Sequence, residues 1–173
     1  MASVSRTTSS DERRTTPEER EFREAMSSFP TGVTVVTTFH EGVPYGMTLN
    51  ALTSVSLDPR LLLVCLSSTS RTARAVIDRG MFRVNLLAEN QAAVSREFAR
   101  RGADHFGDGD CSLDEHRLPE LPGALGSIVC EVDTVHRGGD HEIVIGRVLS
   151  CQVRPGSPLL FYGGGYGRCT LVA

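Results

Sequence analysis

The chain has 173 residues, of which 40% are hydrophobic and 23% charged, and its formal net charge is −3. This composition predicts one soluble globular domain, and the mildly acidic charge gives no electrostatic support for a nucleic-acid partner. No apolar run approaches the roughly 18 residues of a membrane span, and residues 1–21 lack the apolar segment of a secretory signal. We therefore expect a cytoplasmic protein with no membrane partner.

Lysine is absent, so all 18 basic residues are arginines. This excludes a lysine Schiff base and a Walker-type phosphate-binding lysine. The five cysteines are widely spaced, and the five histidines lack the spacing of a zinc site. We therefore expect reduced thiols and no bound metal.

Residues 1–16 are polar and are predicted to be a disordered tail, which leaves residues 17–173 as the folded domain. A helix is predicted to begin at residues 16–19, where a threonine cap precedes a proline and two acids. Its apolar residues recur at helical spacing and predict one buried face: Phe22, Ala25, Met26 and Phe29.

Short strands separated by turns dominate the remaining sequence. β-branched residues predict a strand at 33–39, and the turn at 40–42 predicts a hairpin with the stretch that follows. Further strands are predicted at residues 61–66, which are apolar on both faces, and at 82–87, 128–136, 142–153 and 159–162. Helices are predicted at residues 71–78 and 91–101. This order of elements predicts a closed or partly closed antiparallel barrel.

The stretch at residues 46–59 begins as a strand and then loses its alternation. It places five short polar side chains among apolar ones: Thr48, Asn50, Thr53, Ser54 and Ser56. Short hydroxyl and amide groups keep the backbone accessible and supply donors and acceptors to a flat ligand. The alternative is an edge strand that runs into the Asp58-Pro59 turn.

A second group of hydroxyl residues, at 67–72, immediately precedes the predicted helix at 71–78 and contains Arg71. Hydroxyls, an arginine and the exposed amides of a helix N-terminus together favour phosphate binding. The alternative is that one serine or threonine only caps the helix.

Three other segments have both a functional and a structural interpretation. Residues 163–167 do not open a helix within a βαβ unit, so they are not a dinucleotide fingerprint. They form either a loop beside a bound ring, with Tyr166 stacking on it, or a C-terminal turn. His141 follows the predicted hairpin turn at 137–140 and is either functional or only solvated. The irregular residues 102–126 form a loop that is either functional or disordered.

Several motifs together resemble those of the flavin reductase-like family, whose fold is the FMN-binding split barrel. They lie at residues 29–36 (FPTGVTVV), 46–59 (GMTLNALTSVSLDP), 82–87 (FRVNLL), 139–141 (GDH), 146–148 (GRV) and 158–162 (PLLFY). The resemblance covers about residues 22–166 and implies a mainly β protein with peripheral helices, folded as an antiparallel split β-barrel. Within the family, the chain looks most like the small reductases that supply reduced flavin to a separate monooxygenase.

The resemblance implies an NAD(P)H:flavin oxidoreductase that reduces FMN or FAD, with NADH favoured over NADPH. It also implies a homodimer and a flavin-dependent monooxygenase component as partner. By matching motifs, the flavin ring would be lined by Thr48, Leu49, Asn50, Ala51 and Ser54 and flanked by Cys65, Leu66 and Ser67. Its phosphate would be reached by Ser70, Arg71 and Thr72, while His141 and Tyr166 would face the nicotinamide nucleotide. Thr31, Phe82 and Asn85 complete the implied cofactor-binding set.

In such an enzyme hydride passes directly between the two cofactor rings. No protein nucleophile or strong base is then required, and no catalytic side chain is expected. Two alternatives are a non-catalytic flavin-binding protein and a haem- or pyridoxal-phosphate-binding relative of the same barrel. An absorption spectrum with added cofactors would distinguish them.

Overall fold

The computed structural model describes residues 16–100, 102, 105–107 and 111–170. The predicted tail at residues 1–16 lies outside this part of the chain except for Thr16. The helices are α1 (Pro17–Ser27), α2 (Arg71–Arg79) and α3 (Ala92–Phe98). The strands are β1 (Thr31–Gly32), β2 (Thr34–His40), β3 (Val43–Leu49), β4 (Leu52–Leu57), β5 (Arg60–Ser67), β6 (Met81–Leu86), β7 (Gly126–Gly138), β8 (His141–Val153), β9 (Leu160–Tyr162) and β10 (Gly165–Gly167).

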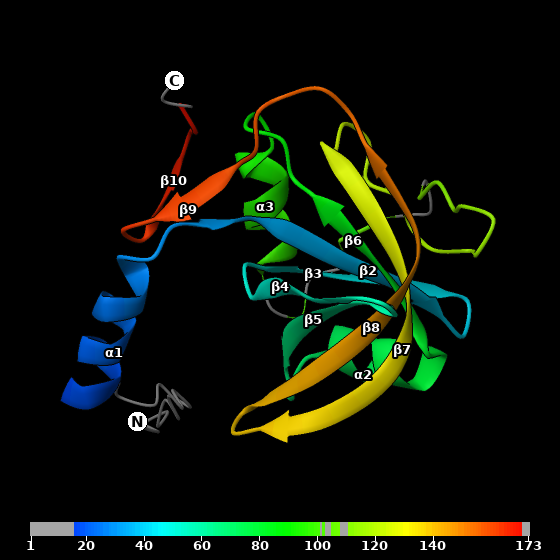
Figure 1. Ribbon diagram of the computed structural model, residues 1–173, viewed down its shortest axis with the longest axis horizontal. Helices are drawn as coiled ribbons and strands as arrows, with labels where there is room; N and C mark the ends of the chain where they lie inside the picture. The colour runs from blue at the N-terminus through cyan, green and yellow to red at the C-terminus, as the bar shows by residue number, and fades with distance from the viewer. Residues whose placement is uncertain (1–15, 101, 103–104, 108–110, 171–173) are drawn as a thin grey trace, which may run out of the picture.

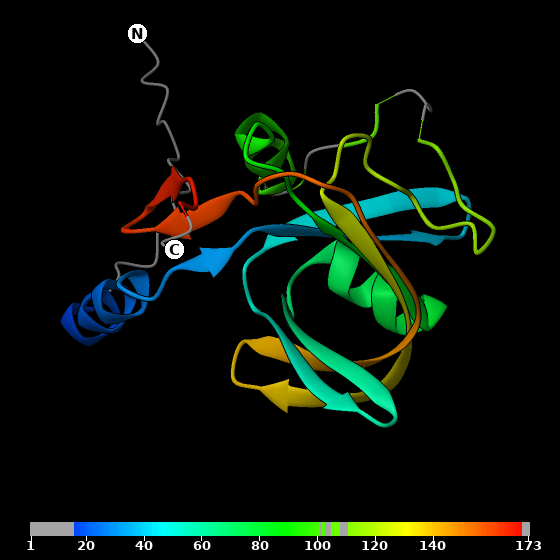
Figure 2. The same cartoon turned by 45° about the horizontal axis from the view of Figure 1, so that its top comes forward.

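Seven strands form one antiparallel sheet in the order β3-β2-β6-β7-β8-β5-β4. Its two edge strands, β3 and β4, are joined by only two residues, Asn50 and Ala51. Opposite edges that are joined so closely must meet at that end, so the sheet curls into a barrel split between β3 and β4 (Figures 1 and 2). This confirms the predicted mainly β, antiparallel barrel with few helices.

The barrel is filled from both of its walls and closed by α2. Val64, Phe82 and Val144 are fully buried inside it, and α2 adds Ala73 and Val76 to the same core. A second core lies under α3 and β9, where Phe98 packs with Val35 and Leu159 among other residues. The residues of β5 alternate between buried and partly exposed, so the prediction of a strand buried on both faces was wrong.

Several local signals in the sequence led to the expected structure. Thr16 and Glu19 form a reciprocal capping box at the start of α1, with hydrogen bonds of 3.0 and 3.2 Å. The β2–β3 hairpin forms as predicted, and the turn between β7 and β8 has Gly139 at a φ of 64°, which glycine adopts without strain.

The predicted buried face of the first helix is not buried within this chain. Phe22, Met26 and Phe29 are 67%, 52% and 66% exposed, and no residue of α1 is buried. Figure 1 shows why, because α1 projects beside β9 and β10 and away from the seven-stranded sheet. The helical spacing correctly predicted an amphipathic helix. Spacing alone does not show what the apolar face packs against.

The two other predicted helical and turn segments also differ in detail. The helix predicted at residues 91–101 is shorter and spans only Ala92–Phe98. The glycine-rich residues 163–167 form a turn and a strand, β10, which pairs with β9 in a three-stranded sheet with β1. Glycine-rich sequence has low strand propensity, so this pairing depends on its neighbours and not on local preference.

Part of the long loop is fastened to the sheet by a buried ion pair. Arg83 of β6 donates to the Asp114 carboxylate at 2.6 Å and to the Ser127 hydroxyl at 2.6 Å, and its side chain is 5% exposed. Asp114 also accepts the backbone amides of His116 and Leu118. The Arg154–Glu120 ion pair at 3.1 Å adds a second charged contact, so two ion pairs anchor the described loop residues 111–125.

We expect Asp114→Ala to lower the free energy of unfolding by about 3 kcal/mol, because it leaves a buried guanidinium without its closest counter-charge. Chemical denaturation followed by circular dichroism measures this loss. Asp133→Ala, on an exposed position of β7, serves as the control and should change stability by less than about 0.5 kcal/mol. Equal effects of the two substitutions would contradict the anchoring role.

Candidate functional site

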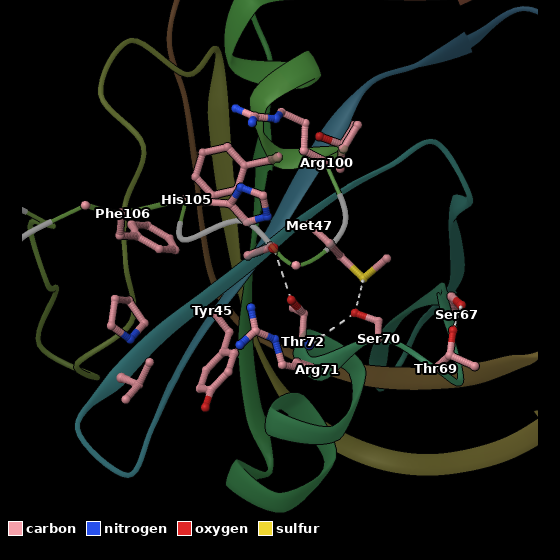
Figure 3. A pocket seen from close by; sticks show the side chains of 18 residues that line it. Tyr45, Met47, Ser67, Thr69, Ser70, Arg71, Thr72, Arg100, His105 and Phe106 are labelled. Carbon is pink, nitrogen blue, oxygen red and sulfur yellow. Dashed lines mark hydrogen bonds between the residues drawn. The ribbon is translucent and has the colours of Figure 1, made fainter. Parts of the chain in front are cut away.

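A cavity of about 660 Å³ opens between β3, the N-terminus of α2, the end of α3 and residues 105–107 (Figure 3). Its lining residues are Val43, Pro44, Tyr45, Gly46, Met47, Thr48, Ser67, Thr69, Ser70, Arg71, Thr72, Phe98, Ala99, Arg100, Gly102, His105, Phe106 and Gly107. The volume falls within the range of roughly 300–1,000 Å³ that is typical of small-molecule sites. Of the residues predicted from the sequence, it brings together Thr48, Ser67, Ser70, Arg71 and Thr72.

The N-terminus of α2 supplies the polar end of this cavity. Ser70 caps the helix by accepting the amide of Thr72 at 3.1 Å, and its hydroxyl donates to the Met47 thioether at 3.4 Å. Ser67 and Thr69 share a hydrogen bond of 3.1 Å beside it. The capping interpretation is therefore correct for Ser70, but capping does not account for the other hydroxyls.

Arg71 differs from the other arginines near the cavity. It is exposed, it makes no hydrogen bond or ion pair with another described residue, and its side chain extends toward the cavity in Figure 3. Arg100, on the opposite wall, instead binds the Glu97 carboxylate at 3.1 Å. A cation without a partner at a helix N-terminus is suited to bind an anion.

Thr72 has a structural partner as well as a place in the cavity wall. Its hydroxyl donates to the Gly46 carbonyl at 3.0 Å, and the residue is 6% exposed. The bond connects α2 to β3. It therefore also fixes the polar end of the cavity relative to the part of the cavity wall that β3 forms.

An aromatic group forms the other end of the cavity. The ring centroids of Phe98 and His105 are 5.0 Å apart, and those of Phe98 and Phe106 are 5.2 Å apart in an edge-to-face arrangement. The His105 side chain is only 10% exposed, and its Nδ1 has no hydrogen-bond partner among the described residues, with the Glu97 carboxylate 3.8 Å away. Tyr45 of β3 also lines this end.

A second set of predicted residues lies on a neighbouring surface formed by β4, β5 and the β7–β8 turn. Asn50, Ala51 and Ser54 are exposed there, and the Cys65 amide donates to the Ala51 carbonyl at 3.1 Å. His141 pairs with Ser67 across β5 and β8, so it lies close to the polar end of the cavity. Its Nδ1 is hydrogen-bonded to Asp140 at 2.7 Å. Partial burial raises the pKa of the Cys65 thiol, which disfavours a reactive thiolate at this surface.

Four predicted residues lie in the core instead of in the cavity wall. Leu49, Leu66 and Phe82 belong to the barrel core. Asn85 is fully buried, and its amide donates to Val35 and Thr37 while its carbonyl accepts the Leu121 amide. These contacts hold β2, β6 and the loop together, so Asn85 has a structural role in the free protein.

The two remaining predicted residues belong to the three-stranded sheet. The Thr31 hydroxyl is buried without a hydrogen-bond partner. The Tyr166 hydroxyl is hydrogen-bonded to Ser95 at 2.8 Å, and the Arg96 guanidinium lies 5.0 Å from the Tyr166 ring centre. The Ser95 carbonyl also accepts the Thr48 hydroxyl at 2.7 Å, so Ser95 joins the C-terminal strands to the cavity wall.

The structure adds cavity residues that the sequence did not single out: Tyr45, Met47, Thr69, Phe98, Arg100, His105 and Phe106. A partial signal existed for His105 and Phe106, because they fall in the irregular stretch expected to be functional or disordered. Within the described residues, no three His, Cys, Asp or Glu side chains cluster as a metal site requires. No described helix has the length and apolar character to cross a membrane.

The comparisons with known proteins decide the family. The model of the flavin reductase like domain matches residues 26–170. The chain belongs to the flavin reductase-like family. The resemblance, the fold and the function predicted from the sequence, an NADH-dependent flavin reductase that supplies a monooxygenase component, are thereby confirmed.

Three relatives illustrate the similarity. The chain is 41% identical over 148 residues to the reductase subunit HsaB of a flavin-dependent monooxygenase from Rhodococcus jostii, covering 85% of this chain and 76% of that one. It is 40% identical over 149 residues to the FMN reductase (NADH) SmoA of Agrobacterium fabrum, covering 86% and 85%. The structure of the Streptomyces globisporus NADH:FAD oxidoreductase SgcE6 with NAD and FAD fragments matches with a TM-score of 0.82 at 34% identity, covering 91% and 96%.

We expect Thr72→Val to lower the free energy of unfolding by about 1 kcal/mol, because it removes the buried hydrogen bond to Gly46 with little change of shape. Thr72→Ser keeps the hydroxyl and should recover most of the loss. Chemical denaturation of both variants measures the difference. A Thr72→Val protein as stable as the parent would show that the bond does not tie α2 to β3.

Proposed function

We propose that the chain binds the flavin with its phosphate at the N-terminus of α2 and its ring over the surface formed by β4 and β5. The observation that carries this assignment is Arg71, which pairs with no other described residue and lies among the hydroxyls of Ser67, Thr69 and Ser70. These groups complement a phosphate in charge and in hydrogen bonding. The exposed Asn50, Ala51 and Ser54, with Cys65 behind them, lie within the same region and present short groups to a flat ring.

The nicotinamide nucleotide is assigned to the side of the β7–β8 turn, where the half-exposed His141 lies beside Ser67. The two bound cofactors supply the redox chemistry themselves, by transfer of hydride from one ring to the other. The contribution of the chain is to hold the rings together and to exclude water between them. The described surface offers neutral hydroxyl and amide groups that can hold the rings. Hydride transfer between the rings needs no acid–base pair from the protein.

The flavin is proposed to be an exchanging substrate and not a fixed prosthetic group. Its proposed contacts are hydroxyls and one exposed arginine, without a buried charge pair. Contacts of this kind favour moderate affinity, and a reductase that serves a separate monooxygenase must release its product. NADH oxidation that depends on added flavin tests the activity, and flavin binding without such oxidation would indicate a non-catalytic flavin protein.

We expect Arg71→Ala to weaken FMN binding by about 1.5–3 kcal/mol, because one charge-assisted contact to the phosphate is lost. Riboflavin, which has no phosphate, should bind equally well to both proteins. Arg74→Ala is the matched control, since Arg74 lies one turn further along α2 and is already paired with Asp78 at 2.6 Å. Fluorescence titration with both flavins measures the affinities. An equal loss of affinity for riboflavin would show that Arg71 does not bind the phosphate.

A homodimer is proposed as the working form. Phe22 and Met26 of α1 and Phe29, just after the helix, are exposed. They border a cavity of about 360 Å³ that also includes Asn50 and Phe161. On β4, Leu57 is 91% exposed. Exposed apolar surface of this extent is typical of an interaction site. A second copy of the chain would cover α1 beside the proposed ring surface.

Sedimentation should therefore show a dimer at micromolar concentration. The double substitution Phe22→Asp and Met26→Asp should shift the protein toward monomer, because two carboxylates would have to be desolvated at the interface. Arg20→Ala, on the opposite side of α1, should leave the dimer intact. A fully active monomer at micromolar concentration would refute this assembly.

A further inference from the structure

The cavity has two chemically different ends on either side of Arg71 and Thr72. Figure 3 shows Ser67 and Thr69 on one side of these residues and Tyr45 and Phe106 on the other. The first end carries hydroxyls. The second end is aromatic and apolar, because Val43 and Pro44 line the cavity next to Tyr45.

A flavin phosphate at α2 would leave this aromatic end unused if the ligand were FMN, since FMN ends at that phosphate. FAD continues from the same position through a second phosphate into an adenosine. Arg71, which pairs with no other described residue, lies between the two ends. The charge at the junction therefore suits a diphosphate, and the rings beyond it suit a purine, which stacks on aromatic side chains.

The aromatic end is built before any ligand arrives. Phe98 packs on both His105 and Phe106, and the His105 side chain is nine-tenths buried against this group. Phe98 reaches this position because Gly46 has no Cβ, which would lie 2.5 Å from the Phe98 Cε1. A preformed wall reduces the entropy that a ligand loses on binding.

We propose that the aromatic end binds the adenosine of a dinucleotide, and that this dinucleotide is FAD, so that the chain binds FAD more tightly than FMN. The proposal rests on the proposed function, because it takes the flavin phosphate to lie at α2. FAD is favoured over the other dinucleotide, NADH, because the cavity runs continuously from the flavin phosphate site to the rings. The nicotinamide nucleotide is assigned to the side of His141.

The test compares FAD and FMN affinities of the full chain by fluorescence titration. The parent protein should bind FAD about tenfold more tightly than FMN, the effect of one base stacked on an aromatic ring. Tyr45→Ala should abolish most of this difference by weakening FAD alone, and Tyr45→Phe, which keeps the ring, should preserve it. Arg71→Ala should weaken both flavins, because their first phosphate is shared.

Equal affinities of the parent protein for FAD and FMN would overturn the adenosine site even if Tyr45→Ala failed to fold. A variant that lost FMN and FAD to the same extent would also overturn it. A rise in the KM for NADH in Tyr45→Ala, without a change in FAD affinity, would assign the rings to NADH and refute the flavin assignment. A different result would contradict the proposed function itself. In that case the parent protein would show no flavin-dependent NADH oxidation with either flavin.

Discussion

The close approach of Phe98 to Gly46 is the contact on which the cavity depends. At this point a strand of the barrel, the start of α2 and the end of α3 meet, because the Gly46 carbonyl also accepts the Thr72 hydroxyl. Any larger residue at position 46 would displace the Phe98 ring, and with it His105 and Phe106, which pack on that ring. One missing side chain thus determines the relative positions of the polar and aromatic ends.

Local sequence signals predicted the parts of the site that neighbouring residues in the sequence form together. The hydroxyl cluster predicted the start of α2, and Ser70 caps it as such clusters do. The aromatic end could not be predicted in this way, because Tyr45 and His105 are sixty positions apart in the sequence and line one cavity only in the folded chain. The barrel itself was predictable, since β-branched runs and turns recur throughout the chain.

Burial was harder to predict than secondary structure. An asparagine in a strand has the same sequence signature whether it faces a ligand or bonds the backbone of its neighbours, and Asn85 does the latter in the free protein. The converse holds for Phe22 and Met26, whose helical spacing predicted burial although no residue in the described part of the chain covers them. For Asn85 the deciding partners, Val35 and Leu121, lie far away in the sequence.

Ser95 links the cavity wall to the three-stranded sheet, which also shares a hydrophobic core with the barrel. Its carbonyl is bonded to Thr48 in the cavity wall and its hydroxyl to Tyr166 in the three-stranded sheet. That sheet in turn contacts α1, through the Gly163 amide and the Ser27 carbonyl. A tilt of α1 would therefore reach the strand that bears Thr48 through the three-stranded sheet and Ser95.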